Sequence, residues 1–450
     1  MTRLSDEVNR AASARDTIYA LASGQGRAAI AVLRLSGTNV RNIVASLVGK
    51  QPVPRRAHLA TFKDPQSGAP LDRGLVLFFP GPASFTGEDC AEFHIHGGTA
   101  VVAAMIAALA DFEKTRPAEA GEFTRRAFEN GKLDLTEVEG LADLVDAETE
   151  AQRRQALRQA EGGLRHKAEG WRAALLEASA LLEAEIDFAE EADVAPLARK
   201  KLAGILVPVR ADLEAALAAG RAGERLRDGL AVVIAGPPNA GKSTLLNALA
   251  RREAAIVSPL PGTTRDAIEV HLDLAGVPVT LIDTAGLRAA REVVEQIGID
   301  RARAKAKAAD LVLWLSEAGA PAPHEFPSAA SVWPILTKID LQPVAAPPKG
   351  AIALSAATGE NLDLLLHRLV DFARTAAGIG EPVLITRERH RKAFAAAAAT
   401  LRRAEADIGG PVELLAEELR TAVRALEILI GRIDVENVLG EIFARFCIGK

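Results

Sequence analysis

Residues 231–246 read Ala-Val-Val-Ile-Ala-Gly-Pro-Pro-Asn-Ala-Gly-Lys-Ser-Thr-Leu-Leu. An apolar strand leads into a G-x-x-x-x-G-K-S loop, and the loop leads into a helix, which is the context that a P-loop needs. The glycines let backbone N–H groups turn inward around phosphate oxygens, and the helix N-terminus adds positive potential. The stretch therefore predicts a nucleotide site in an α/β domain, with Lys242 at the β and γ phosphates and the Ser243 hydroxyl on Mg²⁺. The nucleotide-binding residues expected in this loop are Asn239, Ala240, Gly241, Lys242, Ser243 and Thr244.

Two further segments are expected beside the phosphates and the metal ion. Strand 279–282 ends in Asp283-Thr284-Ala285-Gly286, where Asp283 would support Mg²⁺ and Gly286 could sense the γ phosphate. Between the P-loop and this strand, residues 262–266 read Gly-Thr-Thr-Arg-Asp, and Thr264 is placed to complete the Mg²⁺ shell. The nucleotide-binding residues predicted from these segments are Thr263, Thr264, Asp283, Thr284, Ala285 and Gly286.

A third segment predicts which base is bound. Strand 332–336 ends in Thr337-Lys338-Ile339-Asp340, and the Asp340 carboxylate can accept two hydrogen bonds from guanine that adenine cannot supply. Ser355 and Ala356 follow another strand and could give a backbone N–H to the guanine oxygen. G proteins usually carry Asn in place of Thr337, which is too short to make the same contacts, so we expect guanine selectivity with weaker affinity. Four elements in this order predict a site for GTP and GDP.

The group that would orient the attacking water is not decided by spacing. Leu287 stands where Ras-like proteins carry a Gln, and it cannot bind water. Glu292 and Glu295 follow within the same stretch, and either carboxylate could act through a mobile loop. A monovalent cation held near Asn239 is one way to supply the positive charge that an arginine finger provides elsewhere.

The bulk composition favours a cytoplasmic protein without a membrane segment. The net charge of -5 gives no general attraction to nucleic acid, so any RNA contact must come from local patches. Cys90 and Cys447 are the two cysteines, too few for a disulfide framework and compatible with a reducing compartment. The N-terminus lacks the apolar core of a secretory signal, and no run of about 18 apolar residues occurs.

The pattern of the chain changes three times, which predicts an α+β domain, a helical domain and an inserted α/β domain. Apolar runs at 29–35 and 75–79 indicate strands, with a helix expected at 101–109. Thr136 followed by Glu139 is a capping-box pattern that predicts the start of the helical region. Because the ends of an α/β domain often lie close together, we expect the helical stretches on both sides of it to pack as one domain. Two independent helical domains are the alternative. The predicted boundaries are 1–130, 131–228, 229–372 and 373–450.

Three features of the N-terminal and C-terminal regions remain open. Arg34 sits inside an apolar strand, where a charge is costly unless it is paired, so it is either a salt-bridged edge residue or a ligand-binding residue. Glu92, His94 and His96 alternate on one strand face, a weak indication of a metal site without further ligands. Cys447 could be a reactive thiol or an inert tail residue.

The chain resembles the bacterial tRNA-modification GTPases called MnmE or TrmE along essentially its whole length. The matching segments are Val32-Leu33-Arg34-Leu35-Ser36-Gly37, Ser84-Phe85-Thr86-Gly87-Glu88-Asp89, His96-Gly97-Gly98, Gly121-Glu122-Phe123-Thr124, Asn130-Gly131-Lys132-Leu133-Asp134-Leu135, the P-loop, residues 262–266, Asp283-Thr284-Ala285-Gly286-Leu287-Arg288 and the C-terminal Phe446-Cys447-Ile448-Gly449-Lys450. Pro237 stands where the family commonly has Arg, and we expect little consequence.

The resemblance implies an N-terminal domain for folate binding and dimerisation, joined to a helical domain with an inserted G domain. It further implies that G domains pair across GTP in the presence of K⁺. The K⁺ ligands implied are Asn239, Ser258, Leu260 and Thr263, with Ser258 also at the nucleotide, and Glu295 would be the water-orienting carboxylate. A 5-formyl-tetrahydrofolate-type donor would be bound by Arg34, Glu92, Lys132 and Lys450, and Cys447 would be catalytic.

The resemblance also implies partners: a second copy of the chain, tRNA, and an FAD-containing MnmG-like protein that carries the flavin. Together they would modify the wobble uridine at carbon 5 with a carboxymethylaminomethyl or aminomethyl group. Two basic stretches could meet tRNA phosphates, or could equally be solvated helix faces; they are Arg153, Arg154, Arg158, Arg165 and Lys167, and Arg387, Arg389, Arg391 and Lys392. A ribosome-assembly GTPase or a scaffold GTPase without substrate chemistry is the alternative function.

Overall fold

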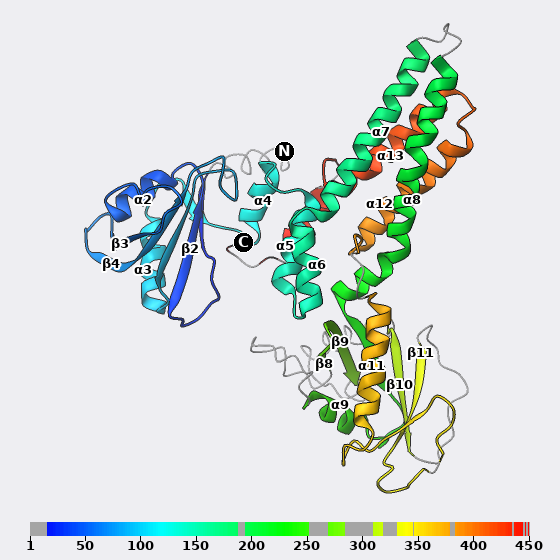
Figure 1. Cartoon of the computed structure of the whole chain (residues 1–450). Coiled ribbons are helices and arrows are strands. Elements are labelled where there is room, and N and C mark those ends of the chain that lie inside the picture. The colour runs from blue at the N-terminus through cyan, green and yellow to red at the C-terminus, as the bar shows by residue number, and fades with distance from the viewer. Residues whose placement is uncertain are drawn as a thin grey trace, which may run out of the picture. The chain divides into compact units, whose positions relative to one another are not determined.

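The computed structural model divides into two compact units (Figure 1). One unit comprises residues 1–142 and 430–450, and the other comprises residues 143–429. The residues that the structure describes are 16–187, 194–251, 269–283, 309–317, 331–344, 346–378, 383–433, 436–443, 446 and 449.

The first unit is built on a mixed six-stranded sheet in the order β3-β4-β5-β2-β1-β6. Neighbouring strands are antiparallel except β1 and β6, which are parallel. Phe62 and Phe93 pack with ring centroids 5.1 Å apart inside the core. This arrangement confirms the α+β prediction. The strands are β1 (Thr17–Leu21), β2 (Ile30–Ser36), β3 (His58–Lys63), β4 (Pro70–Phe79), β5 (Cys90–His96) and β6 (Thr115–Pro117), and the helices are α2 (Val40–Val48), α3 (Thr99–Ala110), α4 (Glu122–Glu129) and α14 (Glu436–Phe443).

Helix α5 (Leu135–Asp146) begins with a capping box, but not with the one that the sequence pattern predicts. The Glu137 N–H donates to the Asp134 carboxylate at 2.7 Å, and the Asp134 N–H donates to the Glu137 carboxylate at 2.7 Å. The predicted pair of Thr136 and Glu139 is wrong, because the Thr136 hydroxyl itself donates to Asp134 at 2.8 Å. The Asp134 carboxylate, two residues before Thr136, accepts from the free Glu137 N–H, so the helix starts there.

The C-terminal helix α14 belongs to the core of the first unit. Ile442, Phe443 and Phe446 cluster with Leu135 and Val138 of α5. The chain therefore returns to the N-terminal unit after the helical region.

In the second unit, helices from both sides of the inserted α/β segment pack against each other (Figure 1). Arg210 donates to the Glu405 carboxylate at 2.8 Å, and Trp171 meets Phe394 edge to face with centroids 5.3 Å apart. Trp171, Leu175, Ala178 and Leu182 recur at helical spacing along α7, and all four side chains are buried. The helices are α6 (Glu150–Ala160), α7 (Gly163–Asp187), α8 (Val194–Asp228), α12 (Glu388–Ala406) and α13 (Val412–Ile430).

The α/β segment has a six-stranded sheet in the order β12-β11-β10-β7-β9-β8. All neighbouring strands are parallel except β8 and β9. This order confirms the inserted α/β fold with a mostly parallel sheet. The elements are β7 (Leu230–Ala235), α9 (Lys242–Ala250), β8 (Glu269–Leu274), β9 (Val277–Asp283), β10 (Leu311–Glu317), β11 (Ser331–Thr337), β12 (Ile352–Ala353) and α11 (Leu362–Ala376). Within the described residues, no helix combines the length and the apolarity needed to cross a membrane.

Candidate functional site

The P-loop follows β7, an inner strand of the α/β sheet, and its backbone is left-handed at three positions. Gly236 has φ 147°, and a Cβ built there would lie 2.3 Å from the carbonyl oxygen of Leu315. Asn239 has φ 64°, and Gly241 has φ 89° at the N-cap of α9. Because L side chains are strained at such angles, the glycines at 236 and 241 are required by the path of the loop.

The side chains after the loop are held close to it and to the neighbouring strand. The Lys242 ammonium donates to the carbonyls of Gly236 at 2.9 Å and Pro237 at 2.8 Å. The Ser243 hydroxyl donates to the Asp283 carboxylate at 2.8 Å. Since β7 and β9 are parallel neighbours, their carboxyl ends share one sheet edge, where ligands bind in open α/β folds. The structure thus brings together the two described residues that were predicted to support Mg²⁺.

The predicted base-recognition segment is tied to the P-loop through Thr337. This buried residue donates from its hydroxyl to the Ala240 carbonyl at 2.9 Å and is 3.2 Å from the Ser316 carbonyl. The short side chain therefore does reach the P-loop. Lys338 pairs with Glu317 at 2.5 Å, and Asp340 is exposed at the same end of the sheet.

The backbone N–H and the hydroxyl of Ser355 both make hydrogen bonds within the turn that follows β12, which the sequence did not indicate. Its N–H donates to the Glu360 carbonyl at 3.1 Å, and its hydroxyl accepts from the Thr358 N–H at 3.2 Å. Of the two residues expected to offer a backbone N–H to guanine, Ser355 thus already donates its N–H within the turn. Ten predicted site residues lie outside the described residues: Ser258, Leu260, Thr263, Thr264, Thr284, Ala285, Gly286, Glu295, Cys447 and Lys450.

A second candidate site lies in the first unit, around Arg34 and Glu92. The two residues are cross-strand partners on β2 and β5, and their side chains form an ion pair at 3.0 Å. The ion pair expected for the charge of Arg34 in an apolar strand is therefore present. The expectation that Arg34 lies on an edge strand is wrong, because β2 lies inside the sheet between β5 and β1.

The ion pair lines a pocket of about 440 Å³. The Arg34 guanidinium carbon lies 5.8 Å from the ring centroid of Phe85, which is itself 41% exposed. Aromatic and apolar walls with a few fixed polar groups are typical of small-molecule sites. The lining residues are Arg34, Arg55, Phe79, Ala83, Ser84, Phe85, Thr86, Cys90, Glu92, Thr124 and Leu141. Lys132 lies beside the same loop, because its Cγ is 3.5 Å from the position of a Cβ built on Gly87.

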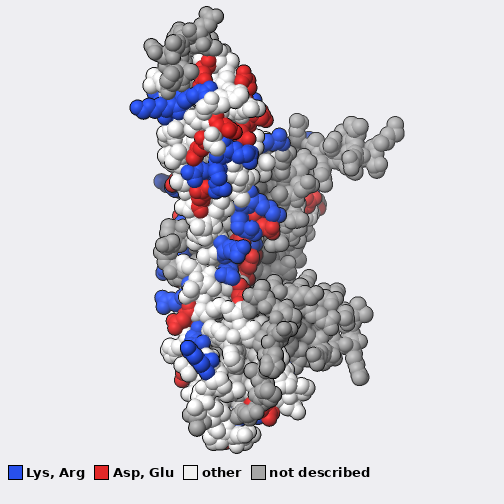
Figure 2. Space-filling model, turned by 90° about the vertical axis from the view of Figure 1, so that its right-hand side faces the viewer, with Lys and Arg blue, Asp and Glu red and all other residues white. Residues whose placement is uncertain are grey.

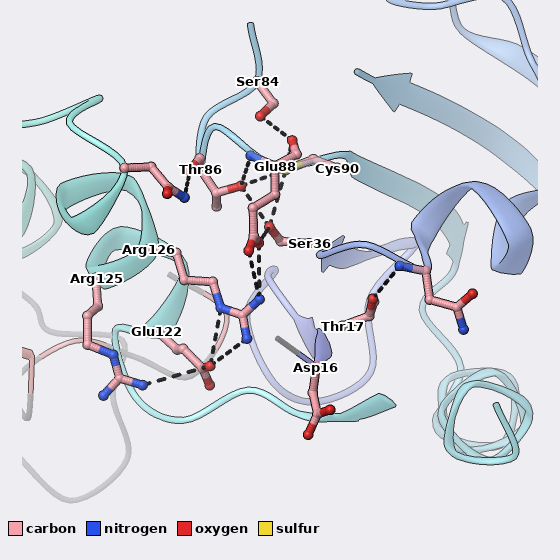
Figure 3. Close-up of polar contacts among 12 residues, drawn as sticks. Asp16, Thr17, Ser36, Ser84, Thr86, Glu88, Cys90, Glu122, Arg125 and Arg126 are labelled. Carbon is pink, nitrogen blue, oxygen red and sulfur yellow. Dashed lines mark hydrogen bonds and ion pairs between the residues drawn. The ribbon is translucent and has the colours of Figure 1, made fainter. Parts of the chain in front are cut away.

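A buried charge network that sequence reasoning missed supports this pocket (Figure 3). Arg126 donates to the carboxylates of Glu122 and Glu88, each at 3.0 Å, and Glu88 accepts from the Ser36 hydroxyl at 2.6 Å. Burial alone would raise the pKa of Glu122, but hydrogen bonds from Arg116 and the Glu119 N–H, with the charge of Arg126, lower it overall. These residues come from separate segments, so spacing along the chain gave no signal.

The histidines of β5 do not form a metal site with Glu92. His94 Nε2 is 3.5 Å from the Glu92 carboxylate, whereas His96 Nδ1 is 2.8 Å from Asp72. Across the described part of the chain, no three His, Cys, Asp or Glu side chains gather in a way that could hold a metal ion.

The predicted basic stretches are largely paired with acidic side chains. Arg153 and Arg154 both bind Glu150 at 2.7 Å, which lowers the pKa of that exposed carboxyl to about 2. Figure 2 shows Lys and Arg side chains next to Asp and Glu along the face that it draws. In the second stretch the pairs are Arg387 with Asp143, Arg391 with Glu224, and Lys392 with Glu388. This pairing favours ion-paired helix faces over a surface for phosphates.

The parallel sheet, the P-loop and the Thr337-x-x-Asp340 corner define a P-loop GTPase. Residues 17–132 match the family described as GTP-binding protein TrmE N-terminus, and residues 135–447 match the MnmE helical domain. The protein belongs to the family of the tRNA modification GTPase MnmE.

Curated relatives support this assignment along the whole chain. The tRNA modification GTPase MnmE of Beijerinckia indica is 59% identical over 98% of this chain and 97% of the relative. The MnmE of Parvibaculum lavamentivorans is 54% identical over 97% of this chain and 100% of the relative. The MnmE of Rhodopseudomonas palustris strain BisB5 is 52% identical over 96% of this chain and 99% of the relative.

Proposed function

We propose that this protein hydrolyses GTP to drive modification of tRNA. With an FAD-dependent MnmG-like partner, it would install a carboxymethylaminomethyl or aminomethyl group at carbon 5 of the wobble uridine in the cytoplasm. GTP binding and hydrolysis are supported by a cluster of side chains at one sheet edge. There the Ser243 hydroxyl donates to the Asp283 carboxylate at 2.8 Å, and the Thr337 hydroxyl donates to the Ala240 carbonyl at 2.9 Å. The tRNA part rests on family membership.

At the nucleotide, the backbone of 236–241 and the Lys242 ammonium would bind the phosphates. The Ser243 hydroxyl and the Asp283 carboxylate supply hard oxygen atoms, which suit Mg²⁺, and Thr264 would complete the set. Mg²⁺, when bound, neutralises charge on the phosphate oxygens. Asp340 would select guanine, with Lys338, Ser355 and Ala356 around the base.

We further propose that K⁺ promotes G-domain pairing and hydrolysis. Asn239 is the described member of the proposed ligand set, and its left-handed backbone leaves it at the bend of the P-loop. Glu295 would position the attacking water. Hydrolysis should be faster in K⁺ than in Na⁺, and Glu295→Ala should block it while GTP still binds. Equal rates in the two salts would show that the cation has no such role.

The pocket at Arg34 and Glu92 is proposed to bind a 5-formyl-tetrahydrofolate-type donor, with Lys132 and Lys450 contributing. Its fit is supported by the fixed ion pair and the aromatic wall. A donor held there would bring a one-carbon group, and Arg34 and Glu92 would orient it.

The proposed organisation keeps domain boundaries near 130, 228 and 372, with a second helical part from 373 to 450. Residues 430–450 of that part pack with the N-terminal unit. Packing of α8 on α12 supports one helical domain that flanks an inserted G domain. The chain is proposed to act as a homodimer and as a hetero-oligomer with the flavin protein, with Cys447 as a catalytic thiol.

Nucleoside analysis of wobble-position tRNA tests the proposed function. The wild-type gene and the genes for the Lys242→Ala and Cys447→Ser variants would each be expressed in a deletion strain, with protein levels matched. Loss of the modification in both variants is expected. Unchanged modification in both would instead favour a ribosome-assembly or scaffold GTPase.

A further inference from the structure

The N-terminal pocket is lined by one cation that has no carboxylate partner among the described residues. The charged residues of the lining are Arg34, Glu92 and Arg55. Arg34 and Glu92 compensate each other, because their side chains pair at 3.0 Å. Arg55 is exposed, and the side-chain hydrogen bond described for it goes to a neutral carbonyl. The described lining therefore carries one positive charge that a bound molecule can neutralise.

The guanidinium of Arg55 is nevertheless held at a defined place. It donates to the Ala83 carbonyl, and its central carbon lies 5.8 Å from the ring centroid of Phe79, another residue of the pocket lining. The Arg55 backbone has φ 59°, an uncommon angle for a long side chain, and its N–H donates to the Phe78 carbonyl at 2.8 Å. A charge that is positioned before binding costs a ligand less conformational entropy.

The loop that carries Ala83 is anchored by other contacts. The Gly81 N–H donates to the Asp89 carboxylate at 2.8 Å, and the same carboxylate binds Arg41 at 2.6 Å. This carboxylate is therefore already paired with a cation other than Arg55. A guanidinium has several N–H donors in one plane, so Arg55 can bind a ligand while it keeps its contact with Ala83.

We propose that Arg55 binds an anionic tail on the ligand of this pocket and so selects acidic ligands over neutral ones. The inference rests on the proposed function, in which the ligand is a reduced folate whose glutamate tail carries carboxylates. The planar guanidinium of arginine matches a carboxylate in geometry and charge. The Arg34–Glu92 pair offers donors and acceptors without net charge, which suits a neutral ring. The pocket thus has separate groups for the ring and for the tail.

Isothermal titration calorimetry with two ligands tests the proposal. The ligands are 5-formyl-tetrahydrofolate and its bis-amide, in which neutral amides replace the carboxylates of the tail. Wild-type protein should bind the acid about tenfold more tightly than the bis-amide, the low end for a hydrogen bond to a charged group, because Arg55 is exposed. Arg55→Gln removes the charge and keeps an N–H donor for Ala83, so it should bind both ligands with the affinity that wild type has for the bis-amide.

Arg56→Gln is the matched control. Arg56 is the next residue, is also exposed, and does not line the pocket. Both variants lose one positive charge at the same turn, so a general attraction of anions would weaken equally in the two. Arg56→Gln should keep the wild-type preference for the acid. The ratio of the two affinities is the measure, because a displaced Ala83 loop would weaken the binding of both ligands.

Two results would overturn the proposal while the folate function stands. One is equal affinity of the wild-type protein for the acid and the bis-amide. The other is an equal loss of affinity for both ligands in Arg55→Gln, which would assign Arg55 to holding the loop at Ala83. No binding of either ligand by the wild-type protein would overturn both the proposal and the folate part of the proposed function.

Discussion

The hydroxyl of Thr337 donates a hydrogen bond to the backbone carbonyl of Ala240, 2.9 Å away and 97 residues earlier in the chain. The contact joins the end of β11 to the P-loop, and Ser316 of β10 accepts from the same hydroxyl at 3.2 Å. The segment that would recognise the base and the loop that would bind the phosphates are therefore one connected structure.

Replacing Thr337 with Val should destabilise the protein and weaken GTP binding. The Ala240 and Ser316 carbonyls share the single proton of this hydroxyl and would lose it, which costs about 1–3 kcal/mol. Thr337→Ser keeps the hydroxyl and is the matched control. Denaturant unfolding and equilibrium binding of labelled GTP would measure both effects. Equal affinity in the Val and Ser variants would show that the bridge has no part in nucleotide binding.

Replacing Gly236 with Ala should abolish nucleotide binding. The new Cβ would lie 2.3 Å from the Leu315 carbonyl oxygen at a φ of 147°, so the P-loop must move. Gly204→Ala in α8 is the control, because nothing lies within 4 Å of its Cβ, and alanine favours a helix by about 1 kcal/mol. Filter binding with labelled GTP would compare them. Normal binding by Gly236→Ala would contradict the described loop path.

Replacing Glu122 with Gln should destabilise the N-terminal unit by about 1–3 kcal/mol, because half-buried Arg116 would lose its nearest carboxylate and buried Arg126 would keep only Glu88. The pKa of Glu122 is lowered in the folded state from its ordinary value of 4.5. Its charge therefore contributes stability above about pH 4.5, and this contribution is lost as pH falls through the lowered pKa.

Thermal unfolding of wild type and Glu122→Gln between pH 7 and pH 3 would measure this difference. The difference in unfolding temperature between wild type and Glu122→Gln should be constant near neutral pH and should become smaller in acid. Glu119→Gln, which removes an exposed carboxylate from the same network, is the control and should have little effect. A gap that widens in acid would refute the assigned direction of the pKa shift.

Asp143 binds an arginine at each of the two connections between the helices and the α/β segment of the second unit. Its carboxylate binds Arg227 at 2.9 Å, just before β7, and Arg387 at 2.6 Å, just before α12. Asp143→Ala should cost about 1–3 kcal/mol, because Arg387 loses this ion pair and Arg227 loses one of its two carboxylates, the other being Asp228. Hydrogen exchange should accelerate at residues 226–230 and 383–388, while GTP affinity is retained. Unchanged exchange at both segments would rule out this role.

The sequence predicted the elements whose signals are local. The P-loop and the strand ends at Asp283 and Thr337 depend on short-range patterns, and the structure confirms these elements. The capping box was misplaced because the pattern compared Thr136 with Glu139 and did not include the competing Asp134 carboxylate.

The charge network and the hydroxyl contacts could not be predicted from spacing. Glu88 and Arg126 are 38 residues apart and meet only because the loop before β5 folds onto α4. Thr124 matched a family motif, yet only the fold shows that its hydroxyl is buried without a hydrogen-bond partner among the described residues. Ser355 illustrates the converse case, since its N–H is already donated to the Glu360 carbonyl.

The central claim is that the backbone around Lys242 holds a triphosphate whose base is selected by Asp340. Equilibrium binding of labelled GTP in Mg²⁺ and K⁺ buffer, with unlabelled ATP as competitor, tests it most directly. Wild-type protein should bind GTP and resist excess ATP, Asp340→Ala should lose this selectivity, and Lys242→Ala should bind neither nucleotide. No detectable GTP binding by the wild-type protein, or equal displacement by ATP and GTP, would contradict the account.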